Sequence, residues 1–163
     1  MKKIATYFFL LLPFQAWCQF HEKFDDNRNQ WFIENGDAYS RKIESGKYVL
    51  ETFNEGHGQF TNMPWRFDPT RDFAMEISFV QKSGSINNGI GLYWGKVSRM
   101  NNFYNEFVIT TNGYYKTGVF GHDDWVQTDK IRPLGETNTL RVEKRGRTLS
   151  YFLNDKMLTT WPG

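Results

Sequence analysis

Apolar and polar residues alternate one by one through most of this chain beyond its first 18 residues. The stretch 72–81 shows the pattern most clearly, with Phe73, Met75, Ile77 and Phe79 on one side and Glu76 and Ser78 on the other. A period of two places successive side chains on opposite faces, which is the geometry of a half-buried β-strand. After the first 18 residues, no window of about eleven residues keeps a helical period. The sequence therefore predicts an all-β protein.

The alternating runs are short and are separated by Gly, Asn or Asp. The predicted strands cover 38–43, 47–53, 72–81, 89–94, 103–110, 114–120, 125–131, 139–143, 148–153 and 156–161. Asn112-Gly113 and Asn154-Asp155 are two-residue turn signals, and Gly46 takes the left-handed position of a hairpin at 44–46. Short strands at this spacing predict a two-sheet antiparallel sandwich of the jelly-roll type, with the inner faces forming the core.

Residues 1–18 have the layout of a secretory signal peptide. Lys2 and Lys3 precede an apolar run at 4–13, and small residues at 16 and 18 place the cleavage site before Gln19. The apolar run is too short to span a bilayer, which needs about 20 residues. We expect an exported protein (periplasmic, cell-surface or secreted) with no transmembrane span after cleavage. A buried N-terminal helix is the alternative.

Lipid attachment at Cys18 is a further alternative. Gln15 and Trp17 stand where a lipoprotein site prefers an aliphatic and a small residue, so the sequence favours simple cleavage.

Removal of the leader leaves one predicted β-sandwich domain over 19–163. The whole chain has 20 basic and 18 acidic residues, and loss of Lys2 and Lys3 gives 18 against 18. A neutral chain offers no reason to expect nucleic acid as a partner. Because Cys18 is the only cysteine, the remaining domain has neither disulfides nor cysteine-bound zinc. An aromatic content of 18% excludes a disordered chain.

Four segments carry a family resemblance. They are 24–31 (FDDNRNQW), 44–50 (ESGKYVL), 107–115 (FVITTNGYY), and 138–143 with 151–155 (NTLRVE and YFLND). In this order they resemble the concanavalin A-like lectin/glucanase superfamily. Within it, the resemblance is to bacterial exported domains related to the DUF1080, or 3-keto-disaccharide hydrolase-like, group. The resemblance implies a jelly roll with a concave sheet that often holds carbohydrate.

The chain departs from the family pattern in two respects. The Glu-x-Asp-x-x-Glu string of the glucanases is absent, and Glu76 is the only carboxylate within 73–81. Family members also usually end with two further strands, whereas this sequence stops at Gly163. Lack of the closing strands would leave a sheet edge open. Either the sequence is shortened at its C-terminal end, or residues 20–25 or a partner cover that edge.

A ring-lined face is the predicted ligand site. Gly89 and Gly91 alternate with apolar residues and would leave a shallow floor on the side that carries a tyrosine ring. Aromatic rings with nearby carboxylates suit a sugar, whose C–H face stacks while its hydroxyls are hydrogen-bonded. The candidate ligand-binding residues are Tyr93, Tyr104, Glu106, Tyr115 and Trp125. The alternative is that these aromatics fill the core.

Metal and phosphate sites are weakly indicated. His122-Asp123-Asp124 is interpreted as a polar turn, and a structural calcium site that uses Asp123 and Asp124 is the alternative. The run from Gly91 to Lys96 does not fit a phosphate-binding loop, and no Gly-x-Ser-x-Gly elbow appears.

These observations leave three hypotheses on function. The first is a non-catalytic exported module that binds glycan or a cell-surface protein. The second is a glycoside-processing enzyme, for which Glu76, Glu106 and Asp123 would be the carboxylates to test. The third is a structural or assembly domain that pairs through an open sheet edge.

Overall fold

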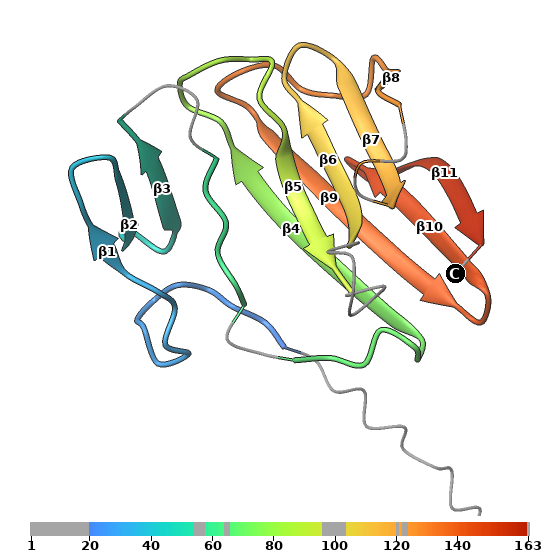
Figure 1. Cartoon of the computed structure of the whole chain (residues 1–163), viewed down its shortest axis with the longest axis horizontal. Helices are drawn as coiled ribbons and strands as arrows, with labels where there is room; N and C mark the ends of the chain where they lie inside the picture. Colours follow the sequence, from blue (N-terminus) through green and yellow to red (C-terminus); the bar gives the residue numbers. More distant parts are fainter. Residues whose placement is uncertain are drawn as a thin grey trace, which may run out of the picture. The chain divides into compact units, whose positions relative to one another are not determined.

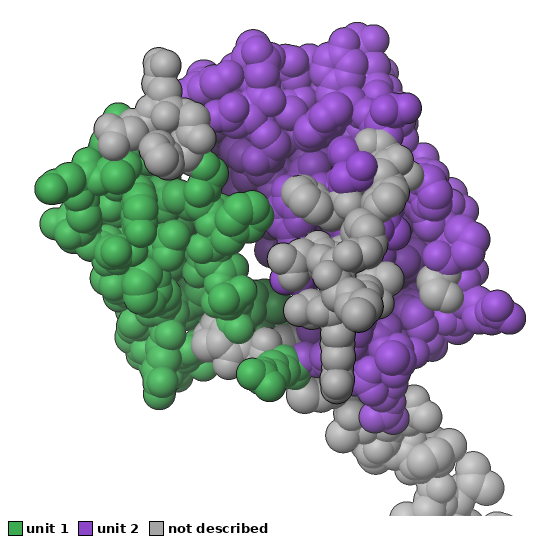
Figure 2. All heavy atoms as spheres, viewed as in Figure 1, with its two compact units in different colours: residues 1–66 green, residues 67–163 purple. Residues whose placement is uncertain are grey.

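The computed structural model describes residues 20–53, 58–63, 66–95, 104–119, 121 and 124–162. Every regular element in these ranges is a β-strand, which confirms the predicted all-β class. The chain divides into two compact units, residues 1–66 and residues 67–163, which Figure 2 colours separately. Each unit is described by itself.

Unit 1 contains a three-stranded antiparallel sheet in the order β1-β2-β3. Its strands are β1 (Glu34–Asn35), β2 (Tyr39–Ile43) and β3 (Tyr48–Thr52). The predicted hairpin joins β2 to β3, with φ of 53° at Ser45 and 68° at Gly46. Two left-handed residues in a two-residue turn match the right-handed twist of the strands. The two-residue strand β1 was not predicted, because it is too short to show a period.

A small aromatic cluster stabilises the segment before β1. The ring of Trp31 lies 5.1 Å from that of Phe24 and 5.2 Å from that of Tyr48.

Glu22 is hydrogen-bonded to the same segment. Its Oε2 accepts hydrogen bonds from Trp31 Nε1 at 2.8 Å and Asn29 Nδ2 at 2.6 Å, and its Oε1 accepts one from the Phe24 amide. These hydrogen bonds hold the pKa of Glu22 below its usual value, and the bond from Asn29 has the largest effect.

Unit 2 is built from two four-stranded antiparallel sheets. The first has the order β11-β10-β9-β4, from β4 (Phe73–Val80), β9 (Thr137–Arg145), β10 (Thr148–Leu153) and β11 (Lys156–Pro162). The second has the order β5-β6-β7-β8, from β5 (Ile90–Trp94), β6 (Asn105–Thr110), β7 (Tyr114–Val119) and β8 (Val126–Gln127). Figure 1 shows the two sheets as layers, with β5, β6 and β7 in front of β4, β9 and β10.

The core of unit 2 lies between these sheets, which makes it a β-sandwich. Tyr151 on β10 contacts rings of the opposite sheet, with its centroid 5.5 Å from Phe107 and 6.1 Å from Trp94. The buried apolar residues come from both layers: Leu92, Trp94, Phe107 and Ile109 from the second sheet, and Leu140, Val142, Leu149, Tyr151 and Leu153 from the first. The alternating faces predicted for 72–81 and 103–110 account for this arrangement in β4 and β6.

Both predicted asparagine turns join strands of unit 2, but only Asn154-Asp155 forms the predicted two-residue turn. The turn at Asn112-Gly113 has three residues, 111–113, because Thr110 pairs with Tyr114. Gly113 has φ 103° between β6 and β7, while Asn154 and Asp155 have φ 50° and 65° between β10 and β11. Asn154 also donates from Nδ2 to the carbonyl of Lys130. The strand predicted at 125–131 is shorter than expected, because only Val126–Gln127 pairs with β7.

The first sheet of unit 2 has β11 and β4 as its edge strands. Among the described strands, β10 is the only partner of β11 and β9 is the only partner of β4. Each of these outer strands therefore keeps one side without a strand partner in the part of the chain that the structure describes.

Candidate functional site

The candidate site lies on the face of the β5–β8 sheet that points away from the core. Tyr93 on β5 is the cross-strand partner of Glu106 on β6, and Gly91 is the partner of Val108. Val108 in turn pairs with Lys116 on β7. Because neighbouring residues of a strand point to opposite faces, these five residues share the side opposite Phe107 and Ile109. We call this side the outer face.

A buried ion pair forms the centre of the outer face. Glu106 Oε1 lies 3.4 Å from Lys116 Nζ, and Glu106 is only 2% exposed. No described residue hydrogen-bonds to this oxygen, so Lys116 is the group that stabilises the charge. Burial, and then the charge of Glu106, raise the pKa of the neighbouring Tyr93 hydroxyl. Tyr93 therefore remains neutral and able to donate a hydrogen bond well into the alkaline range.

Two exposed rings lie on this face with glycines between them. Tyr93 is 37% exposed and Trp125 is 44% exposed. Trp125 lies against β5, because its Cη2 atom is 3.4 Å from the position that a Cβ of Gly89 would take. Gly89, directly before β5, and Tyr93 are four residues apart, which is about 13 Å at ~3.3 Å per residue of extended chain. The backbone surface between the two rings is therefore longer than one pyranose ring.

Gly91 lies in the middle of this floor. A Cβ at this position would be 2.0 Å from the carbonyl oxygen of Phe107, so the backbones approach too closely for any other residue. Gly91 therefore adds no side chain to the face between the two rings, where Val108 of β6 is its neighbour.

A shallow polar depression adjoins the Trp125 end. It measures about 450 Å³ and is lined by Gln127, Thr128, Asp129 and Lys130. Gln127 follows Trp125 by two residues and so points to the same side of the strand. The depression offers amide, hydroxyl, carboxylate and ammonium groups from the residues that follow Trp125 in the chain.

The remaining predicted site residues are placed differently. Tyr104 precedes β6 and is 36% exposed. Tyr115 pairs with Ile109 and packs against the core, on the side opposite Glu106. The structure thus brings Tyr93, Glu106 and Trp125 to one face and separates Tyr115 from them.

Sequence reasoning missed Lys116. The Asn112-Gly113 turn sets a register in which Val108 opposes Lys116 and Ile109 opposes Tyr115. A two-residue turn at Asn112-Gly113, as predicted, would pair Thr110 with Tyr115 and so place Tyr115 on the side of Glu106. The structure instead has a three-residue turn, 111–113, because Thr110 pairs with Tyr114, and this shift of one residue brings Lys116 to that side.

The carboxylates considered for catalysis do not form a pair. Glu76 is exposed on the outward side of β4 and lies 3.7 Å from Arg141 Nε. Glu106 lies on the outward side of the opposite sheet. Acid–base hydrolysis of a glycoside needs two carboxyl groups within about 10 Å on either side of one bond, and these two face away from each other. Asp123 lies outside the described residues.

Metal binding finds no support in the described ranges, where no three His, Cys, Asp or Glu residues are grouped to hold an ion. Asp124 belongs to these ranges, but His122 and Asp123 do not, so the calcium site stays a prediction. The described residues also contain no helix that is long and apolar enough to cross a membrane.

Comparison with known proteins gives no match. No family model matches the chain, and neither does any curated protein or solved structure. The resemblance to concanavalin A-like domains therefore stays a prediction from the sequence.

Proposed function

We propose that this protein is exported and binds carbohydrate on the outer face of its β5–β8 sheet, without catalysing a reaction. The jelly-roll topology and the relationship to concanavalin A-like lectins are part of the same proposal. The observation that carries it is the pair of exposed rings, Tyr93 and Trp125, at the two ends of a glycine floor.

Ring stacking is the main interaction in this proposal. A pyranose presents a flat C–H surface that packs on an aromatic ring, and the glycine floor lets a sugar approach the backbone closely. The span from Tyr93 to Trp125 suits two or more linked sugars that lie along β5. The polar groups of residues 127–130 are placed to hydrogen-bond sugar hydroxyls next to Trp125.

Glu106 has an indirect role. With 2% exposure its carboxylate is beneath the surface, so it holds Lys116 in place rather than contacting the ligand itself. A charged group that is buried and ion-paired fixes the geometry of its neighbours, because moving them would leave the charge unpaired.

Titration of the protein against a panel of neutral oligosaccharides tests the proposal. Tyr93→Ala and Trp125→Ala should each weaken binding by about 5- to 150-fold, which corresponds to the about 1–3 kcal/mol that a ring stacked on a nucleobase contributes. Phe53→Ala is the matched control, since Phe53 is an exposed ring of unit 1. Absence of binding at millimolar concentrations of every oligosaccharide would refute the carbohydrate proposal.

A further inference from the structure

One end of the β-sandwich is hollow. In the first sheet, Phe73, Lys144 and Leu149 form a row across β4, β9 and β10, because Phe73 and Leu149 both pair with Lys144. In the second sheet, Asn105 pairs with Trp94 and with Val119, which gives the corresponding row across β5, β6 and β7. A cavity of about 230 Å³ is lined by these two rows and by Pro69.

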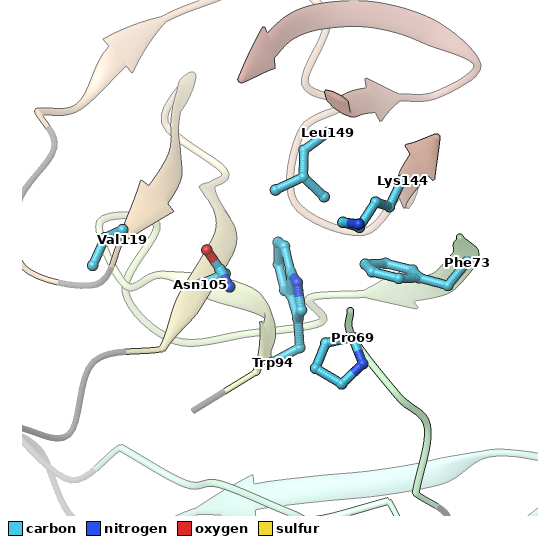
Figure 3. Close-up of a pocket in the computed structure, with 7 residues that line it drawn as sticks. All are labelled: Pro69, Phe73, Trp94, Asn105, Val119, Lys144 and Leu149. Carbon is cyan, nitrogen blue, oxygen red and sulfur yellow. The ribbon is translucent and has the colours of Figure 1, made fainter. Parts of the chain in front are cut away.

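The next row of residues toward the middle of the sandwich is packed with apolar side chains. Val142 and Phe107, each two residues further along its strand, are completely buried. In the rows at the end of the sandwich, Lys144 and Asn105 stand where the next rows have the apolar residues Val142 and Phe107. The space between the two sheets is therefore not filled at this end. Figure 3 shows Lys144, Asn105 and Phe73 directed toward Trp94 around the cavity.

Both polar groups keep unused hydrogen-bonding capacity. Lys144 Nζ donates to the carbonyl oxygens of Thr70 at 3.0 Å and Gly146 at 2.9 Å, which leaves one of its three hydrogens. The charge of Lys144 helps to lower the pKa of Asp68, but among the described residues no carboxylate lies within ion-pair distance of Lys144. The side-chain amide of Asn105 has no hydrogen-bond partner among the described residues. A positive charge and a free amide therefore face an otherwise apolar cavity.

We propose that this cavity binds a small aromatic carboxylate, with one ring and one carboxyl group. Its volume suits one ring, since a dry cavity of about 150 Å³ in another protein holds benzene. The ring would pack between Trp94, Phe73 and Leu149, and the carboxylate would accept hydrogen bonds from Lys144 Nζ and Asn105 Nδ2. Charge-assisted bonds of this kind are roughly twice as strong as neutral ones. This site is separate from the outer face, so it does not depend on the proposed glycan function.

Phenylacetate is the probe for the test, with phenylacetamide as its neutral analogue and acetate as the anion without a ring. Binding is followed by amide chemical-shift changes of the labelled chain. We expect phenylacetate to saturate a site that includes the Trp94 indole N–H. Phenylacetamide should bind about tenfold more weakly, and acetate should not bind up to about 10 mM.

Three variants locate the site. Lys144→Gln retains donors for the two carbonyls but loses the charge, so it should remove the preference for phenylacetate over phenylacetamide. Asn105→Leu fills the cavity with an apolar side chain and should weaken both ligands while leaving the melting temperature unchanged or higher. Lys156→Gln, on β11 of the same unit, is the control and should bind like the wild type.

Two results would overturn the proposal. One is the absence of saturable phenylacetate binding at about 10 mM, a concentration that detects even millimolar affinity. The other is an equal affinity for phenylacetate and phenylacetamide in the wild type, or an unchanged preference in Lys144→Gln, since either excludes recognition of the carboxylate.

Discussion

Glu106 and Lys116 lie diagonally across the β6–β7 ladder, with 3.4 Å between Oε1 and Nζ. Both side chains are largely removed from solvent, at 3% and 15% exposure. A buried pair differs from a surface pair because removal of one member leaves the other charge without compensation in a poorly solvated place.

We therefore expect Lys116→Met to destabilise the protein by about 3 kcal/mol in urea unfolding. The double variant Glu106→Gln with Lys116→Met should recover much of that loss, because it removes both charges. Lys42→Met is the comparison, since Lys42 and Glu44 form an exposed ion pair at 3.2 Å whose removal should cost about 1 kcal/mol at most. Equal losses for Lys116→Met and Lys42→Met would contradict the burial argument.

The titration of Tyr93 provides a second prediction. Burial, and then the charge of Glu106, raise its pKa above the usual value of about 10. A pKa that is higher in the folded state gives stability that is complete below the unfolded value and is lost as the pH rises through the folded value. The phenol of Tyr93, assigned by its loss in Tyr93→Phe, should thus titrate above the free amino acid in NMR. Glu106→Gln should lower this pKa only in part, and a full return to the ordinary value would contradict burial as the larger cause.

Gly91 in β5 and Gly89 directly before β5 should respond differently to substitution. Gly91→Ala places a Cβ at 2.0 Å from the Phe107 carbonyl oxygen, so β5 and β6 must separate, at a cost of about 3 kcal/mol. Gly89→Ala meets Trp125 at 3.4 Å, which a small shift of an exposed ring relieves, so its free energy of unfolding should change by about 0.5 kcal/mol or less. The two variants are compared by chemical denaturation. The reverse order of stability would show that β5 and β6 are not paired in this register.

Unit 1 should be sensitive to acid through Glu22. Hydrogen bonds from Asn29, from the Phe24 amide and from Trp31 lower its pKa in the folded state. Its contribution to stability is therefore present above the unfolded pKa of about 4.3 and is lost as the pH falls through the lowered folded value. The Trp31 indole N–H resonance should shift in this acidic window in the wild type and not in Glu22→Gln. Identical pH profiles of the two proteins would refute the role of Glu22.

Much of the fold follows from local sequence. The residues that alternate in 72–81 became β4, Asn154-Asp155 became the two-residue turn that its chemistry predicts, and Asn112-Gly113 became part of a three-residue turn. These features depend on neighbours within a few residues, since strand alternation and turn conformation are local properties. The short strand β1 and the early end of β8 depend instead on pairing between strands, which no local pattern encodes.

The candidate sites depended far more on tertiary structure. The alternation of apolar and polar residues assigned Tyr93 and Glu106 to one face of their strands. It could not show that Trp125 lies on Gly89 or that Lys116 lies beside Glu106. Tyr115 illustrates the limit, because one step of register moves a side chain from the outer face to the core. The cavity at the end of the sandwich was not foreseen at all, since its two rows come from strands that are distant in the sequence.

The sequence by itself determined that this chain forms paired β-strands, where most of those strands turn, and that one side of each strand is apolar. Only the tertiary structure decided which strands are neighbours, and with them which rings are exposed together, which carboxylate is buried against a lysine, and where the two sheets fail to close. The physical reason is that the period of a strand is set by backbone geometry within a few residues. Register and layer packing are set by the burial of apolar surface between segments far apart in the chain.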